Sequence, residues 1–102
     1  MHTTSLTLLT IVAEEVLGRD LTALVLQLGS TGFTSTPCRG EGSRGLRSVG
    51  GGNVRIEVIV STALADTIVT KLATDYFPNY AVIAWMSAVS VVRGDKYTRL
   101  GD

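Results

Sequence analysis

The stretch of this sequence with the most evident chemistry is Arg39–Asn53, which combines arginine with glycine. It holds six of the eleven glycines, and residues 38–55 carry four arginines against one glutamate, a local charge of +3. Glycine lets backbone N–H groups turn toward an anion, and arginine donates paired hydrogen bonds to phosphate or carboxylate oxygens. The segment therefore predicts an anion site, and a solvated surface loop without a ligand is the alternative that its composition permits.

Two familiar nucleotide-binding motifs do not describe this segment. The glycines at positions 40, 42 and 45 match the dinucleotide fingerprint, but that motif opens a helix, and residues 46–52 end in three glycines that no stable helix tolerates. A Walker A loop requires Gly-Lys followed by Ser or Thr, which the sequence does not contain. An irregular loop is therefore expected to hold the anion.

A second stretch, Gly29–Thr34, joins an expected helix to an expected strand. One interpretation is a plain glycine cap followed by a tight turn. The functional interpretation is an exposed backbone edge that recognises a polar ring, with the hydroxyl of Thr34 beside it and Phe33 available for packing.

Other reactive side chains are isolated along the chain. His2 is the only histidine and lies at the terminus, and Cys38 has no histidine or second cysteine at metal-ligand spacing. The pair Glu14–Glu15 is typical of a helix N-terminus. Because no nucleophile, acid–base pair or metal cluster can be assembled, we expect a protein without enzymatic activity and without a metal site.

The elements that position these stretches follow from hydrophobic periodicity. Strands are expected over residues 5–12, 33–37, 54–60 and 81–92, and helices from about Glu15 to Gly29 and from Ser61 to Tyr76, ahead of Pro78. The order strand–helix–strand occurs twice around the glycine-rich loop, and residues 93–102 are expected to form a loop. Two such units predict an α+β, ferredoxin-like sheet of four strands with both helices on one face.

The last expected strand is apolar on both of its faces. Val82, Ala84 and Met86 alternate with Ile83 and Trp85, and the first strand shows a similar pattern. Two helices cover only one face of a four-stranded sheet, so the other face would be a large exposed apolar patch in a single chain. The sequence therefore predicts an oligomer, and a face covered by lipid or by a ligand is the alternative.

Length and charge restrict the remaining possibilities. The 102 residues suffice for one domain, and nine basic against nine acidic residues argue against a nucleic-acid-binding protein. The longest uncharged run, residues 76–92, is shorter than the roughly 20 apolar residues of a membrane-spanning helix. The single cysteine fits a reducing compartment, so a cytoplasmic protein is expected.

The sequence resembles the PII-like signalling proteins, and among them the carbon-regulatory branch with its carboxysome-associated members. The resemblance covers about Thr4 to Arg93 and is carried by Gly32–Thr34, the loop 40–48 (GEGSRGLRS), Asn53–Val58 and Tyr80–Trp85. Its most specific stretch is Gly-x-Gly-Ser-Arg-x-x-Arg-Ser.

The resemblance implies a homotrimer of ferredoxin-like βαββαβ subunits, each a single domain over residues 1–102, with adenine nucleotides in the clefts between subunits. Residues of about 39–53 would form the flexible T-loop, and residues 93–102 a short tail. The implied nucleotide-binding residues fall into three groups: Gly32, Phe33 and Thr34 on the base and ribose side, Gly40, Gly42, Ser43, Arg44 and Arg47 on the phosphates, and Arg93 from the neighbouring subunit.

The implied function is a regulator that binds AMP or ADP, with bicarbonate as a further candidate ligand and no prosthetic group. Its T-loop would signal to a membrane transporter for bicarbonate or a related anion, so the protein would be cytoplasmic and would reach the membrane through that partner.

The sequence departs from nitrogen-regulatory PII proteins at three places. Residues 39–53 contain no tyrosine for nucleotidylation, the only glutamine is Gln27 in the first helix, and Phe77–Tyr80 replaces a Gly- and Lys-rich loop. Fewer cations would then meet a γ-phosphate, so AMP and ADP are expected to bind better than ATP. Two alternatives stay open: a trimeric metal-binding or metal-tolerance protein on the same fold, and a weak nucleotide hydrolase.

Overall fold

The computed structural model describes residues 1–40 and 52–97. Its elements, in chain order, are β1 (Thr3–Glu14), the 3₁₀ turn η1 (Glu15–Leu17), α1 (Gly18–Leu28), β2 (Thr34–Cys38), β3 (Asn53–Val60), α2 (Thr62–Asp75), β4 (Ile83–Val92) and the 3₁₀ turn η2 (Gly94–Lys96). In this part of the chain, neither helix is long and apolar enough to cross a membrane.

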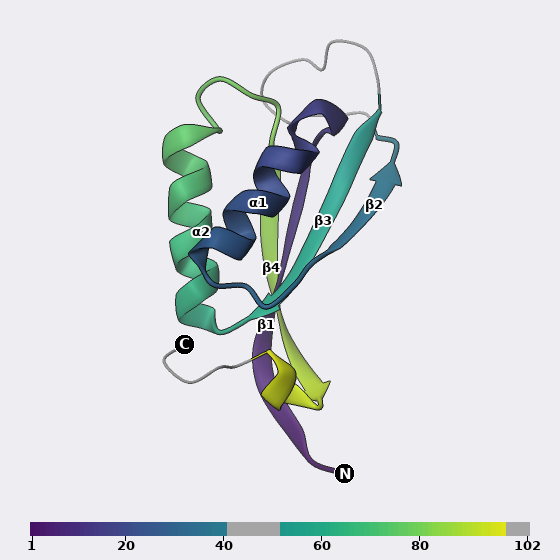
Figure 1. The fold of residues 1–102 in the computed structure, drawn as a ribbon, viewed down its shortest axis with the longest axis vertical. Coiled ribbons are helices and arrows are strands. Elements are labelled where there is room, and N and C mark those ends of the chain that lie inside the picture. The colour runs from purple at the N-terminus through teal and green to yellow at the C-terminus, as the bar shows by residue number, and fades with distance from the viewer. Residues whose placement is uncertain (41–51, 98–102) are drawn as a thin grey trace.

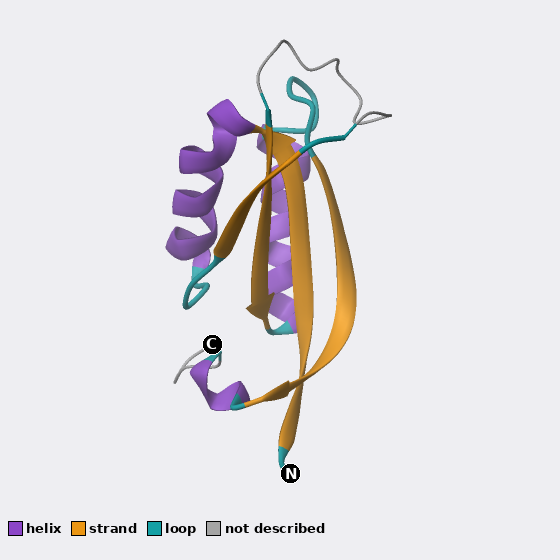
Figure 2. Cartoon of the chain, turned by 90° about the vertical axis from the view of Figure 1, so that its right-hand side faces the viewer, coloured by secondary structure: helices purple, strands orange, loops and turns teal. Residues whose placement is uncertain are grey.

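The four strands form one sheet in the order β2-β3-β1-β4, and every neighbouring pair is antiparallel. Both helices lie on one side of this sheet, as the two perpendicular views show (Figures 1 and 2). The architecture is therefore the predicted α+β, ferredoxin-like βαββαβ sandwich.

Alternation along the strands places the core between the sheet and the helices. Leu9 pairs with Val58 and Ile11 with Ile56, and these four side chains are almost fully buried. The helices contribute the remaining large buried side chains: Leu17, Leu21, Leu24 and Val25 from the first helical segment, and Ile68 and Leu72 from α2. Burial of each such side chain stabilises the fold by roughly 1.5–3 kcal/mol.

Local sequence signals set the helix ends. Gly29 follows α1 with φ at 124°, a conformation that L side chains rarely adopt, and the Ser30 N–H donates to the Val25 carbonyl oxygen at 2.9 Å. At the start of α2, the Ser61 hydroxyl accepts the N–H of Leu64 at 3.1 Å. The predicted glycine stop and Ser61 cap are both present.

The first and last strands of the chain differ from the prediction at their ends. The last strand begins at Ile83 instead of residue 81, because a tight turn in which the Val82 N–H donates to the Tyr80 carbonyl oxygen (2.9 Å) precedes it. The first strand is longer than predicted, since β4 pairs with it as far as Thr3. The predicted loop after the last strand contains the turn η2.

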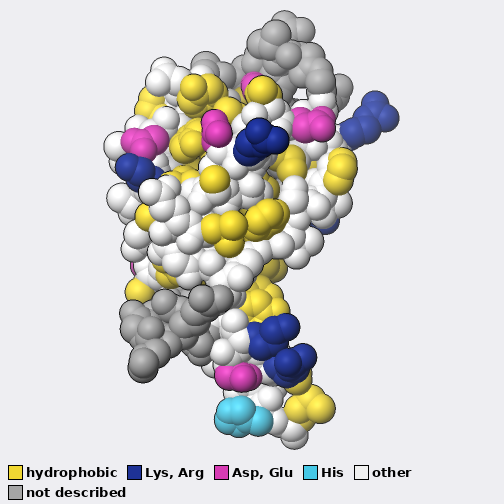
Figure 3. Space-filling view, viewed as in Figure 1, with side chains coloured by type: hydrophobic (Ala, Val, Ile, Leu, Met, Phe, Trp, Pro, Cys, Tyr) yellow, Lys and Arg dark blue, Asp and Glu magenta, His cyan; other side chains and the backbone are white. Residues whose placement is uncertain are grey.

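Strands β1 and β4 continue beyond β3 as a two-stranded ribbon. Thr3–Leu6 pair with Val89–Val92, whereas the pairing of β3 with β1 ends at Thr7. The space-filling view shows Lys and Arg side chains gathered on this projecting end, next to the single histidine (Figure 3). We call the paired residues 3–6 of β1 and 89–92 of β4 the projecting ribbon.

The sheet face opposite the helices carries one of the two apolar rows of β4, and the other row faces the core beside Leu9 and Ile11. Trp85 lies opposite Thr10 on this face and is 47% exposed. Ile83, Val89 and Val91 share the face with it and are only partly buried. No helix among the described residues covers these side chains.

Candidate functional site

The main cavity of the described residues lies where the pairing of β2 with β3 ends. It has a volume of about 570 Å³. Its lining comes from β1, the α1–β2 loop, β2, β3 and the C-terminal turn: Leu8, Thr31, Gly32, Phe33, Thr34, Glu57, Val58, Ile59, Lys96 and Tyr97.

The α1–β2 loop is held in place by its own hydrogen bonds. The buried Ser30 hydroxyl donates to the Gly32 carbonyl oxygen at 2.6 Å and accepts the Gly32 N–H at 3.5 Å. These bonds follow directly on the α1 terminus at Gly29, so the end of the helix determines where residues 31–34 lie. The loop therefore presents Gly32 and Thr34 to the cavity as a preformed wall.

A strand edge forms the opposite wall. The β2–β3 ladder begins with the pair Thr34–Glu57, and β3 continues for three more residues, Val58 to Val60, with no β2 partner. Val58 is 2% exposed because its side chain points into the core, so its backbone is what it contributes to the lining. This arrangement gives the cavity a run of strand backbone, able to donate and accept hydrogen bonds.

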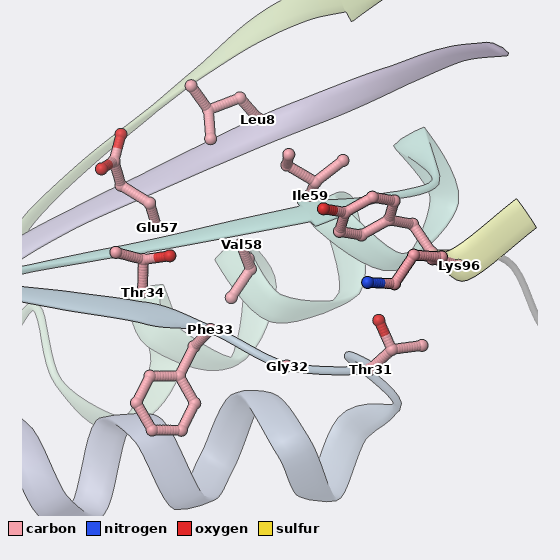
Figure 4. A pocket seen from close by; sticks show the side chains of 10 residues that line it. Leu8, Thr31, Gly32, Phe33, Thr34, Glu57, Val58, Ile59 and Lys96 are labelled. Carbon is pink, nitrogen blue, oxygen red and sulfur yellow. The ribbon is translucent and has the colours of Figure 1, made fainter. Parts of the chain in front are cut away.

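Polar side chains turn into the cavity from several elements. Figure 4 shows the ammonium group of Lys96 and the hydroxyl groups of Thr31 and Thr34 directed into it, whereas the Phe33 ring points toward α1. Phe33 is 44% exposed and lines a second cavity as well.

Opposite charges lie at the two ends of the cavity. The carboxylate of Glu57 is 3.8 Å from Arg55 Nε, a long ion pair between partly exposed groups and therefore a weak one. Within residues 1–40 and 52–97, Lys96 has no ion-pair partner. The ammonium group is thus available to an acceptor atom of a ligand.

The predicted base-side residues Gly32, Phe33 and Thr34 come together at this cavity. Gly40 follows the far end of β2, and at about 3.3 Å per residue it lies roughly 20 Å from Thr34. Arg93 directly precedes η2 and does not line the cavity of its own chain. The remaining predicted phosphate ligands lie outside the described residues: Gly42, Ser43, Arg44 and Arg47.

Sequence reasoning missed more than half of the ten lining residues. Glu57 and Ile59 were assigned only to a strand, and Lys96 and Tyr97 only to a polar tail. Strand alternation is the signal that could have found Glu57 and Ile59, because they share a sheet face with Leu8. No comparable pattern indicates Lys96 and Tyr97.

The second cavity, of about 300 Å³, lies between α1 and the other side of β2. Glu15 and Arg19 line it from the helical side, and Ser35 and Pro37 from the strand. Glu15 also ties this region to β3, since its backbone N–H donates to the Gly52 carbonyl oxygen at 3.0 Å. Among the described residues, no three His, Cys, Asp or Glu side chains come together as a metal site would require.

The turn that precedes β4 is aromatic. The rings of Tyr76 and Tyr80 lie 5.7 Å apart at 46°, and the Tyr80 N–H donates to the Tyr76 carbonyl oxygen at 2.9 Å. Burial, followed by the carboxylates of Asp20 and Asp75, raises the pKa of the Tyr76 hydroxyl above its usual 10.0. The segment Phe77–Tyr80 is therefore a packed turn without a cation.

Comparison with known proteins decides the family. The model of the family described as nitrogen regulatory protein P-II matches residues 6–96. The chain belongs to the P-II family. Proteins of this family assemble as trimers, which agrees with the homotrimer expected from the resemblance and with the uncovered sheet face around Trp85.

Solved structures similar to this P-II chain extend over nearly its whole length. A protein of Thermus thermophilus described as a PII-like signalling protein is 52% identical, with a TM-score of 0.85, over 96% of this chain and 100% of that chain. CPII from Thiomonas intermedia, bound to ADP, AMP and acetate, has the same TM-score at 19% identity, over 95% and 98% of the two chains. CPII bound to ADP and bicarbonate has a TM-score of 0.82 at 20% identity, over the same shares of the two chains.

Proposed function

We propose that this P-II protein is a non-enzymatic regulator that binds adenine nucleotides, and that the main cavity holds the nucleoside. The observation that carries the proposal is the cavity of about 570 Å³ at the end of the β2–β3 ladder, with Gly32 and Thr34 in its wall. The fold shared with CPII, which was solved with ADP and AMP bound, supports the same class of ligand.

The exposed edge of β3 accounts for a preference for adenine. A strand edge offers one N–H and one C=O from alternate residues, and adenine offers the complementary ring nitrogen and amino group. Guanine presents a carbonyl oxygen and a ring N–H in the reverse order, so it would meet like groups at the same edge. The hydroxyl of Thr34 adds an adaptable donor or acceptor beside this edge.

The phosphates are proposed to meet a different subunit. Thr34 and Gly40 lie roughly 20 Å apart along β2, which is longer than a nucleoside diphosphate. A site that uses both ends of β2 therefore combines the cavity of one subunit with the T-loop base of its neighbour in the trimer. The proposed phosphate ligands are Gly40, Gly42, Ser43, Arg44 and Arg47, with Arg93 contributed across the same interface.

We propose AMP and ADP as the favoured ligands, ahead of ATP. The aromatic turn Phe77–Tyr80 contains no cation that would neutralise a γ-phosphate. Bicarbonate is a further candidate ligand, since CPII has been solved with ADP and bicarbonate together. No prosthetic group is part of the proposal.

The proposed output is a change in the T-loop population. Nucleotide binding alters that population only if the ordered loop binds the phosphates more tightly than the alternative conformations do. The T-loop would then contact a membrane transporter for bicarbonate or a related anion, which places the protein in the cytoplasm and at the membrane through its partner. No described residue favours the metal-binding or hydrolase alternatives.

Calorimetric titration with AMP, ADP, ATP and GDP tests the proposal. The wild-type protein should bind AMP and ADP more tightly than ATP, and GDP least. Thr34→Val, which keeps the side-chain shape, and Arg47→Ala should weaken binding of AMP and ADP, whereas Arg19→Ala, on the surface of α1, should not. Absence of binding by the wild-type protein to every adenine nucleotide would refute the proposal.

A further inference from the structure

The second cavity lies on the helix side of β2 and is distinct from the main cavity. Among the described residues, the two linings share only Phe33. Thr34 lines the main cavity, whereas the next residue along the strand, Ser35, lines the second. Because successive side chains of a strand point to opposite faces, the two cavities lie on opposite sides of β2. A ligand in the second cavity would therefore not occupy the nucleoside position.

Two opposite charges line this cavity from the first helical segment. Glu15 belongs to the 3₁₀ turn η1, and Arg19 to the first turn of α1. Glu and Arg four residues apart pair readily on a continuous α-helix, but a 3₁₀ turn has three residues per turn and offsets the two side chains. Within residues 1–40 and 52–97, neither side chain has an ion-pair partner. Both charges are therefore available to a ligand.

The carboxylate of Glu15 is positioned by the start of β3. The Glu15 N–H donates to the Gly52 carbonyl oxygen at 3.0 Å. Its Oε2 atom lies 3.3 Å from the place that a Cβ atom on Gly52 would take. The acidic group therefore lies against the backbone that leads into β3, and Arg19 follows it along the helical segment.

The remaining lining is small or apolar. Gly18 leaves space at the start of α1, and a Cβ atom there would be 3.6 Å from Val54 Cγ1. The Phe33 ring points toward α1 (Figure 4), and Pro37 lies further along the same strand. The volume of about 300 Å³ is at the lower end of small-molecule pockets. The cavity thus offers an apolar wall beside two opposite charges, in a space suited to a small metabolite.

We infer that the second cavity binds the zwitterion of a free α-amino acid with an apolar side chain. Arg19 donates paired hydrogen bonds to the carboxylate of the amino acid, and Glu15 accepts hydrogen bonds from its ammonium group. The apolar side chain packs against Phe33 and Pro37. The inference does not rest on the proposed function, since it concerns the other side of β2.

The two charges select a zwitterion over ligands with a single charge. An anion that pairs with Arg19 would also meet the carboxylate of Glu15, and a cation that pairs with Glu15 would meet the guanidinium group. Only a ligand that carries both charges leaves neither group opposed by a like charge. Removal of either ligand charge should therefore weaken binding.

NMR titration of the full chain with leucine and two analogues tests the inference. Isocaproate lacks the ammonium group of leucine, and isoamylamine lacks its carboxylate, whereas both keep the branched apolar chain. Leucine should shift the amide signals of residues that line the second cavity, among them Arg19 and Ser35. Each analogue should bind about tenfold more weakly.

Charge variants assign the two ligand groups. Arg19→Met should lower the affinity for leucine about tenfold without weakening isoamylamine, which has no carboxylate to lose. Glu15→Gln should lower it by a similar factor without weakening isocaproate. Lys71→Met and Asp66→Asn, both exposed on α2 and outside the cavity, are the matched controls and should bind leucine like the wild type.

A third variant fills the cavity. Ser35→Phe introduces a ring from an exposed strand position, where an aromatic residue is well tolerated, and should abolish leucine binding. Thermal unfolding verifies that this variant and the two charge variants are folded.

Three results would overturn the inference. The first is a wild-type protein whose cavity signals do not respond to millimolar leucine. The second is isocaproate binding as tightly as leucine, because Arg19 would then be a simple anion site. The third is full leucine affinity in both Arg19→Met and Glu15→Gln. Titrations with AMP and ADP bear on the proposed function alone, so each of the two proposals can fail without the other.

Discussion

Gly32→Ala is the substitution that separates the function of the main cavity from the stability of the fold. A Cβ atom on Gly32 meets no atom within 4 Å, and among the described glycines only Gly29 has a positive φ. Alanine is therefore compatible with the backbone, and it should leave stability unchanged or raise it by about 0.4–1 kcal/mol through the unfolded chain. The bond from Ser30 to the Gly32 carbonyl oxygen involves no side-chain atom of residue 32 and should persist.

Gly32 lines the space that the nucleoside would fill, so the added methyl group is expected to narrow that space. Crowding of a packed contact by one methyl group costs about 1–3 kcal/mol, which corresponds to a roughly 5- to 150-fold loss of AMP affinity. Gly18→Ala is the matched control, since its Cβ would lie at an ordinary 3.6 Å from Val54 Cγ1 and outside the main cavity. Calorimetric titration and thermal unfolding measure the two effects separately. A Gly32→Ala protein that is folded and binds AMP like the wild type would refute the placement of the nucleoside against this loop.

Three further outcomes follow from contacts elsewhere in the chain. Ser61→Ala removes the hydroxyl that accepts the Leu64 N–H at the start of α2, and it should lower the free energy of unfolding by about 1 kcal/mol at fixed protein concentration. Thr67→Ala removes an exposed hydroxyl in the middle of the same helix and should leave that free energy unchanged. Equal losses of the two variants in denaturant unfolding would contradict the capping argument. Burial raises the pKa of the Tyr76 hydroxyl above 10.0, so the folded state keeps this proton to a higher pH than the unfolded state does. The hydroxyl's contribution to stability is therefore full below pH 10 and is lost as the pH rises through the raised pKa. Tyr76→Phe should flatten this alkaline loss of stability, and an unchanged alkaline slope in the variant would contradict the role of Tyr76. Trp85→Glu places a charge on the uncovered sheet face and should shift the mass measured by light scattering from trimer toward monomer; an intact trimer would exclude this face from the interface.

The fold was predictable because its signals are local and repeated. Residues 54–60 alternate apolar and polar side chains, α2 repeats an apolar residue every four positions up to Tyr76, and Gly29 stops α1. The missed strand ends have a different cause. Ala81 and Val82 are buried and apolar like the strand that follows them, but the turn at Tyr80 delays pairing until Ile83 meets Val12.

The candidate site was predictable only where one contiguous segment builds it. Residues 32–34 follow one another in a single loop whose turn is indicated by its own glycines, so the sequence predicts that they lie together at the cavity. Lys96 and Tyr97 reach the same cavity through the left-handed Arg93 and the close contact of Gly94 with Thr4. Both depend on the pairing of the two ends of the chain, which no local pattern encodes.

The position of β1 in the middle of the sheet bears on how the chain folds during synthesis. β1 is made before the other strands of this sheet, yet one of its edges pairs with β4, which is made after all of them. Until residues 83–92 emerge, β1 offers an apolar edge to any other strand, and long-range pairing of this kind is slow. Premature termination before Ile83 should therefore yield chains that aggregate, and the main cavity should form only after its lining as far as Tyr97 has been made.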